Sequence, residues 1–313
     1  MDRSDVDWRG YWSALPTPFT PDGSADEDAL RALVDLYVRQ GVHGLLFNGS
    51  TGEWVAQTGA ERRRLAEVAV EAVAGRVPLA VGVTSPRLDE ACALAAHAER
   101  AGADAVLAAP APGLRPTPAE LRAYYEEVFS ASGLPAWLYN FPQDAATNVT
   151  PGQLRELVEL PNVVAVKQST PDVREFLATV EAVGERAVVF GHMLSRLGLA
   201  LIEAGYGGDG HFGSGMLLGA RQPEFFERAW KGDRDGALAI VETHDALMER
   251  LRGDASDGYN WRYGGMQASL KAAMNVLGQP GGAPRRPKLP ITDPAALDAI
   301  RESLRAAELE VVA

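Results

Sequence analysis

Short apolar runs alternate with longer amphipathic stretches through most of the chain. Six of the runs are almost continuously apolar, as expected for parallel strands that are buried on both faces. They lie at residues 44–47, 78–81, 105–108, 136–139, 163–166 and 187–190. Two weaker runs, at residues 11–15 and 209–212, extend the series at its ends, so the pattern predicts eight strands.

The stretches between these runs carry the signals of helices. Ser24 and Glu27 are spaced as in a capping box, which predicts that a helix opens at Ser24. Thr150-Pro151 predicts another start, because proline is favoured at the first helical position. Further helices are expected near residues 59–74, 87–101, 118–131, 171–183, 195–204 and 221–231. Eight strand–helix units favour an α/β fold of the (β/α)8 TIM-barrel type over a doubly wound sheet.

The pattern changes after residue 232. Helical segments near 234–252, 262–278 and 293–308 follow one another with no strand predicted between them. A loop rich in glycine and proline, residues 281–290, precedes the last helix. We therefore predict a catalytic barrel over residues 1–232 and a C-terminal helical region over residues 233–313, packed on the barrel.

Composition narrows the classes of partner and compartment. The net charge of −12 disfavours a phosphate backbone, so nucleic acid is not expected as a partner. No apolar run approaches 18 residues and no basic amphipathic stretch is present, so no membrane association is expected. Cys92 is the single cysteine, and the first residues lack the apolar core of a signal peptide. These features predict a cytoplasmic protein.

Lysine is rare in this chain. Lysine and arginine total 30, and only four of these are lysines: Lys167, Lys231, Lys271 and Lys288. Lys167 ends a predicted strand, where a barrel places its active site and where apolar neighbours would lower the pKa of an amine. A free amine there could form a Schiff base with a ketone; a salt-bridged lysine at a strand end is the alternative. Because arginine fills most cationic positions, the lysine favours imine chemistry, which a guanidinium cannot perform.

Two further strand ends carry polar groups. Gly49-Ser50-Thr51-Gly52-Glu53 follows the strand at 44–47, and its glycines and hydroxyls would suit a carboxylate or phosphate. An ordinary strand-to-helix loop explains the same residues. Tyr139, at the end of the strand at 136–139, could relay protons to a substrate or could simply anchor the barrel packing.

Other familiar chemistries find little support. Residues 208–213 have the G-x-G-x-x-G sequence of a dinucleotide-binding fingerprint, but a predicted helix precedes them where a strand is required. We assign them to the last barrel strand and its loop. The histidines show no metal-ligand spacing, so no metal site is expected; His192 and His211 fall at strand ends and could line a site.

Together these motifs resemble the dihydrodipicolinate synthase / N-acetylneuraminate lyase family. The resemblance rests on Gly49-Ser50-Thr51-Gly52-Glu53, on Tyr139-Asn140-Phe141-Pro142 and on Lys167 in Val164-Ala165-Val166-Lys167. Their order is that of the family, and so are Thr17-Pro18-Phe19 near the start and Lys271-Ala272-Ala273 late in the chain.

The resemblance implies a TIM barrel with a C-terminal helical region, usually assembled as a homotetramer and free of metal or organic cofactor. It implies that Lys167 forms a Schiff base with pyruvate or another 2-oxo acid. Gly49, Ser50 and Thr51 would hold the carboxylate, and Thr51 and Tyr139 would serve catalysis, Tyr139 by moving protons.

Two positions depart from dihydrodipicolinate synthases. Those enzymes carry a tyrosine in the loop after the fourth strand, but residues 109–114 contain none. They also carry an arginine five residues after the strand tyrosine, which binds the carboxylate of the second substrate; here that position is Asp144. An anion in place of a cation should reject such a partner, so a neutral, cationic or aromatic one is expected. His192 and Phe212 would line the same pocket.

The sequence therefore predicts a Schiff-base class I aldolase or lyase that acts on pyruvate or a pyruvate-derived 2-oxo acid with an aldehyde partner. A 2-keto-3-deoxy sugar acid dehydratase that uses the same imine is one alternative. A non-catalytic protein that binds a 2-oxo acid is another, and a nicotinamide oxidoreductase is a third. A homo-oligomer, tetramer or dimer, is expected from the family.

Overall fold

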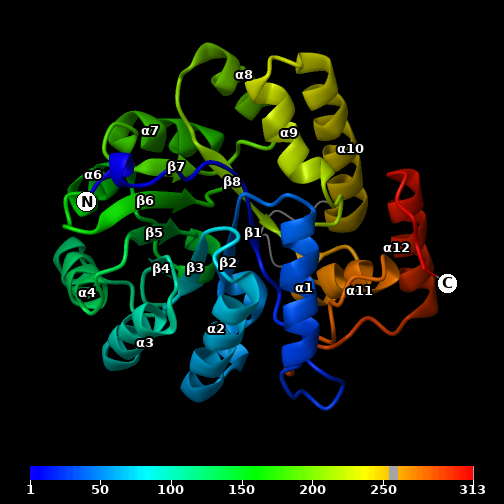
Figure 1. The fold of residues 1–313 in the computed structure, drawn as a ribbon, viewed down its shortest axis with the longest axis horizontal. Helices are drawn as coiled ribbons and strands as arrows, with labels where there is room; N and C mark the ends of the chain where they lie inside the picture. Colours follow the sequence, from blue (N-terminus) through cyan, green and yellow to red (C-terminus); the bar gives the residue numbers. More distant parts are fainter. Residues whose placement is uncertain (254–259, 313) are drawn as a thin grey trace. The chain divides into compact units, whose positions relative to one another are not determined.

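The computed structural model describes residues 1–253 and 260–312. Eight strands join in sequence order into a closed barrel, and the ladders from β3 to β8 are parallel (Figure 1). The strands are β1 (Gly10–Ala14), β2 (Gly44–Phe47), β3 (Leu79–Gly82), β4 (Ala105–Ala108), β5 (Ala136–Asn140), β6 (Val163–Gln168), β7 (Val188–Phe190) and β8 (Gly210–Ser214). Every residue of β1 to β7 is buried, which confirms the prediction from their continuous apolar character.

Helices alternate with these strands, as predicted for a TIM barrel. They are α1 (Glu27–Arg39), α2 (Gly59–Val73), α3 (Leu88–Ala101), α4 (Pro118–Ser130), α6 (Pro151–Leu157), α7 (Val173–Val183), α8 (Arg196–Ala204) and α9 (Arg221–Trp230). Three single turns of 3-10 helix are η1 (Arg3–Asp5), η2 (Ser50–Gly52) and η3 (Trp54–Ala56). The predicted start at Thr150 is confirmed: its side chain caps α6 and forms a capping box with Gln153.

Two local features of the barrel differ from the prediction. Ser24 does not cap α1; the cap is Asp26, whose carboxylate accepts the Ala29 N–H, while Ser24 lies in the preceding turn. A short helix, α5 (Pro142–Ala145), follows β5 and was not predicted, because four residues are too few to show helical periodicity.

The C-terminal region also contains strands that the sequence did not predict. After α10 (Arg234–Arg252), β9 (Asn260–Trp261) and β10 (Gly264–Gly265) pair antiparallel before α11 (Met266–Val276) and α12 (Pro294–Ala306). The helix predicted from residue 262 therefore starts at Met266. Residues 254–259 and 313 of this region lie outside the described part of the chain, and the boundary predicted at residues 232/233 stays a prediction.

Contacts between Cα atoms divide the chain into two compact units. The first comprises Met1–Trp12, His43–Leu46 and Val77–Phe212; the second comprises Ser13–Val42, Phe47–Arg76 and Gly213–Ala313. In the first, a ring cluster fills the interior, with Trp137 stacked on Trp8 at 5.2 Å and edge-on to Phe190 at 4.9 Å between centroids. In the second, α1 packs against α2, and α10 and α11 both pack against α12 (Figure 1).

Candidate active site

Lys167 lies inside β6, one residue before the strand ends at Gln168. In the ladders its Cα pairs with Tyr139 of β5 and with Phe190 of β7. Only 6% of the residue is exposed. Its Nζ lies 4.0 Å from the ring centroid of Tyr139 and 4.8 Å from that of Phe212, so two aromatic faces contact the amine.

Burial lowers the pKa of Lys167 to about 7, and the nearby charge of Asp144 partly opposes this by raising it. The cause is desolvation, since a charged ammonium loses hydration when it is buried. This confirms the expectation of a desolvated amine at this strand end. Near neutral pH about half of such amines are uncharged and nucleophilic.

Tyr139 ends β5 together with Asn140, and its ring stacks on Phe141 at 5.9 Å. The side chain of Asn140 donates to Gln168 and to Asn148, both at 2.8 Å, and accepts the N–H of Val149. These bonds join the ends of β5 and β6 to the segment after α5. Tyr139 and Lys167 therefore lie on adjacent strands whose carboxyl ends are joined by a side-chain hydrogen bond.

Asp144 lies on α5, directly after β5. Its negative charge acts on Lys167 and raises the pKa of the amine, so the anion noted in the sequence lies close enough to influence it. Two neighbours, Gln143 and Thr147, each have a buried oxygen, Oε1 and Oγ1 respectively, without a hydrogen-bond partner in the described residues. The segment after β5 therefore carries an anion that acts on the amine and two buried oxygens without a hydrogen-bond partner in the described residues.

The two strand-end histidines bond to backbone carbonyls. His192 follows β7, and its Nε2 lies 2.7 Å from the Thr170 oxygen while its ring meets Phe176 edge-on. His211 lies in β8, with Nδ1 2.6 Å from the Gly191 oxygen. Because a carbonyl oxygen only accepts, each of these ring nitrogens carries the proton.

Residues 208–213 form β8 and the turn before it, as predicted. A helix, α8, precedes them, so the context of a dinucleotide fingerprint is absent from this segment. Packing explains the glycines instead. A side chain at Gly210 would collide with the Phe190 ring and the Gly10 carbonyl, and Gly208 has a φ of +85°. Phe212 of β8 joins the aromatic cluster and contacts Lys167.

Gly49, Ser50 and Thr51 belong to the second unit, in the segment after β2. Gly49 precedes a single 3-10 turn formed by Ser50–Gly52, and helical turns leave their first N–H groups without an acceptor inside the turn. Thr51 is buried, and its hydroxyl bonds the Ser214 hydroxyl at 3.3 Å. The segment is thus a hydroxyl-bearing turn, as the sequence suggested.

A buried ion pair in this unit was not predicted from the sequence. Lys271 of α11 lies 2.6 Å from the carboxylate of Glu53, the last residue of the glycine-rich motif. Both side chains are at most 1% exposed. The rarity of lysine was the available signal, but Lys271 was placed only in a late helix and in a segment that resembles the family, with no partner predicted for it.

Across residues 1–253 and 260–312, no three His, Cys, Asp or Glu side chains are grouped so that they could hold a metal ion. Within the same ranges, no helix combines the length and the apolar character needed to cross a bilayer.

Comparisons with known proteins give one consistent relationship. The model of the Dihydrodipicolinate synthetase family matches residues 7–306. The 4-hydroxy-tetrahydrodipicolinate synthase of Bradyrhizobium diazoefficiens is 32% identical over 298 residues, which are 95% of this chain and 96% of that protein. A protein of Escherichia coli K12 named "Probable 2-dehydro-3-deoxy-D-pentonate aldolase YjhH" is 34% identical over 77% of this chain and 80% of its own length.

A solved structure agrees in fold. YagE, a prophage protein of E. coli K12 solved in complex with pyruvate, has a TM-score of 0.85 with 24% identity. The match covers 97% of this chain and all of that one.

Proposed function

Because the chain belongs to the dihydrodipicolinate synthetase family, and is thereby a pyruvate-dependent class I aldolase or lyase, we propose that Lys167 is its imine-forming residue. The substrate is pyruvate or a pyruvate-derived 2-oxo acid. The observation that carries the proposal is the buried Lys167 amine, whose pKa is lowered to about 7. The other three lysines, Lys231, Lys271 and Lys288, all lie within the described residues, and each lies outside the barrel strands.

The reaction follows from this amine. The uncharged Nζ adds to C2 of the 2-oxo acid, and loss of water leaves a protonated imine. When the C3–C4 bond breaks, its electron pair flows into the iminium nitrogen and forms an enamine, while C4 becomes the carbonyl carbon of an aldehyde. Protonation of C3 and addition of water then release pyruvate and restore Lys167.

The surrounding residues have roles in this sequence. The faces of Tyr139 and Phe212 lie toward a nitrogen that becomes cationic, and aromatic faces attract cations. Tyr139 also moves the protons that carbinolamine and aldehyde formation require. We assign the substrate carboxylate to Gly49, Ser50 and Thr51, as the family resemblance implies, since this turn carries hydroxyl and N–H groups that can bind an anion.

The second substrate is an uncharged, hydroxylated aldehyde. Asp144 repels a partner that carries its own carboxylate, which argues against dihydrodipicolinate synthase activity. The acceptor oxygens of Gln143, Asp144 and Thr147 suit hydroxyl donors, and we assign His192, which follows β7, to the same substrate pocket. One relative is named as a probable 2-dehydro-3-deoxy-D-pentonate aldolase, and that compound is a 2-keto-3-deoxy sugar acid. Cleavage of such an acid between C3 and C4 releases pyruvate and an uncharged hydroxyaldehyde.

A pyruvate-release assay tests this function. Wild-type protein is expected to release pyruvate from a 2-keto-3-deoxy sugar acid, and Lys167→Arg should lower the rate by a factor of about 10³ or more. Lys231→Arg, at an exposed helix end, is the matched control and should keep full activity. Consumption of the sugar acid with loss of water and without release of pyruvate would indicate the dehydratase instead, and an absence of turnover would indicate a binding protein.

The Asp144 argument has its own control reaction. Condensation of pyruvate with aspartate semialdehyde should be slow compared with condensation with an uncharged hydroxyaldehyde. Equal rates for the two aldehydes would contradict the assignment of Asp144.

The assembly and the compartment belong to the same proposal. We expect a homo-oligomer, a tetramer or a dimer, that works in the cytoplasm, consistent with the single cysteine and the acidic charge. Sedimentation velocity of the purified chain checks the oligomeric state.

A further inference from the structure

Two side chains of α11 contact the segment that follows β2. We call residues 48–56 the β2 loop. Gln267 donates from Nε2 to the carbonyl of Ser50 at 3.0 Å, and Lys271, one turn further along the helix, donates to Glu53 at 2.6 Å. Residues four apart lie on the same face of a helix, so one face of α11 holds both halves of the β2 loop.

Lys271 is suited to this position in a way that arginine is not. Its ammonium has three donors, and three oxygens accept them: Glu53 Oε1 at 2.6 Å, the Thr17 carbonyl at 2.6 Å and the Ala283 carbonyl at 2.8 Å. The side chain is 1% exposed and also contacts the face of Phe19. A planar guanidinium cannot place its donors in this compact arrangement, which explains a lysine in an arginine-rich chain.

Glu53 has an unusual backbone conformation. Its φ is +57°, in the left-handed region that side chains other than Gly, Asn and Asp seldom adopt. It links η2 to η3, so its conformation determines the direction of the β2 loop. Both carboxylate oxygens are bound, Oε1 by Lys271 and Oε2 by the N–H of Arg285 at 3.0 Å. Strained conformations persist where the surroundings over-determine them, and here two partners do so.

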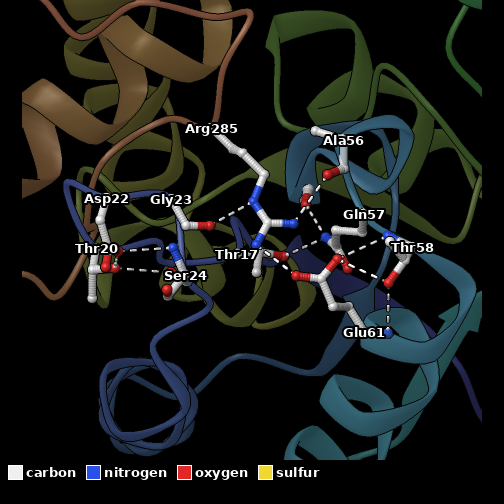
Figure 2. A network of polar contacts seen from close by, with 11 residues as sticks. Thr17, Thr20, Asp22, Gly23, Ser24, Ala56, Gln57, Thr58, Glu61 and Arg285 are labelled. Atoms are coloured by element: carbon white, nitrogen blue, oxygen red, sulfur yellow. Dashed lines mark hydrogen bonds and ion pairs between the residues drawn. The ribbon is translucent and has the colours of Figure 1, made fainter.

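Arg285 extends the attachment to the far end of the β2 loop. Figure 2 shows its guanidinium between the carbonyls of Gly23 and Ala56 and the carboxylate of Glu61. The guanidinium nitrogens donate to the Gly23 oxygen at 2.7 Å, to the Ala56 oxygen at 3.0 Å and to the Glu61 carboxylate at 2.6 Å. This contact lowers the pKa of Glu61 to about 2, so the pair stays charged at neutral pH. The β2 loop is thus held at Ser50, at Glu53 and at Ala56 by residues from the last fifth of the chain.

We propose that Gln267 and Lys271 are positioning residues for substrate binding, which hold the Ser50 and Thr51 donors of the β2 loop in the geometry that receives the 2-oxo acid carboxylate. The inference rests on the proposed function, because only there do Ser50 and Thr51 bind this group. The competing explanation is that the buried pair serves stability alone. Buried ion pairs often contribute little net stability, so we attribute this pair to the positioning of the β2 loop.

Two variants and one control separate these explanations. Gln267→Leu removes the bond to Ser50 without removing a charge. Glu53→Gln combined with Lys271→Met removes both charges together, which avoids leaving one buried and unpaired. Met274→Ala is the matched control for lost packing. It leaves a cavity on α11 at a buried residue for which the described structure shows no hydrogen bond from the side chain to the β2 loop.

The first readout does not depend on activity. Hydrogen–deuterium exchange of the amides in residues 49–53 should speed up about tenfold in Gln267→Leu and in the double variant, and should stay unchanged in Met274→Ala. Equal exchange in all three variants and the wild type would overturn the positioning role, whatever the enzyme's reaction.

The second readout concerns pyruvate. The pyruvate concentration that gives half-maximal borohydride trapping should rise about fivefold or more in Gln267→Leu and in the double variant. The pH midpoint of trapping should stay at its wild-type value, because the surroundings of Lys167 are unchanged. A half-saturation that rises equally in Met274→Ala, or that stays at the wild-type value in Gln267→Leu, would overturn the inference. A wild-type protein that traps no pyruvate would instead refute the proposed function, while the exchange result stands on its own.

Discussion

At the scale of single residues, the charge of Lys167 sets the pH range in which the enzyme can work. Its pKa of about 7 means that about a tenth of the amine is free at pH 6 and about nine tenths at pH 8. Burial produces this value against the opposing charge of Asp144. The rate of imine formation should therefore rise with pH through 7 and level off above about 8.

Asp144→Asn tests the electrostatic part of this account. Asp144 raises the pKa of Lys167, so removing its charge should lower that pKa and move the midpoint of the pH–rate profile toward acid. The measurement is the initial rate of borohydride trapping with pyruvate between pH 5 and 9. Glu126→Gln, an exposed carboxylate on α4, is the control and should leave the midpoint in place. A midpoint that shifts toward alkaline pH in Asp144→Asn would contradict the assignment.

Single residues also show what sequence alone could reach. Lys167, Tyr139 and Phe212 were predicted as site residues, and the structure brings these three together, because residues at the carboxyl ends of parallel strands share an edge. The Lys271–Glu53 pair was not predicted, since its partners lie 218 positions apart and no spacing rule connects them. The influence of Asp144 on the amine also depends on α5, which is too short to be seen in the pattern.

At the scale of elements, local chemistry decided where helices begin. Both Ser24 and Asp26 are good cap residues, and the capping-box spacing favoured Ser24. In the structure Asp26 caps α1, while Ser24 donates its N–H to Asp22 in the turn before it. The sequence carries turn residues and cap residues at overlapping positions here, and the start of α1 in the structure distinguishes the two roles.

The cap makes a prediction about stability. Asp26→Ala should lower the free energy of unfolding by about 1 kcal/mol, because the Ala29 N–H loses its acceptor. Ser24→Ala should change it by less than about 0.5 kcal/mol. Denaturant unfolding of both variants beside the wild type checks this. A larger effect at Ser24 than at Asp26 would restore the capping box that the sequence suggested.

In the C-terminal region, a predicted helix began too early. Residues 262–265 were included in a predicted helix, but Gly264 has a φ of +155°, which ends any helical pattern, and β9 and β10 pair instead. Two-residue strands carry no periodicity of their own, so the turn chemistry of the glycines was the only available signal. Their pairing could not be inferred without the neighbouring helices.

At the scale of the whole molecule, the alternation of strands and helices was enough to predict a TIM barrel. All eight barrel strands lie within a residue or two of their predicted positions, because continuous apolar runs have few alternatives in a chain with so many turn signals. The attachment of the C-terminal helices to the β2 loop could not be read this way. It depends on Gln267, Lys271 and Arg285, polar residues whose partners only the fold reveals.

The most direct test of the central claim is to trap the imine and locate it. The full-length protein is incubated with pyruvate, reduced with borohydride, digested and mapped by mass spectrometry across its four lysines. The account predicts one reduced pyruvate on the peptide that contains Lys167, none on those of Lys231, Lys271 or Lys288, and none in Lys167→Arg. An unmodified Lys167 peptide, or an adduct on another lysine, would contradict it.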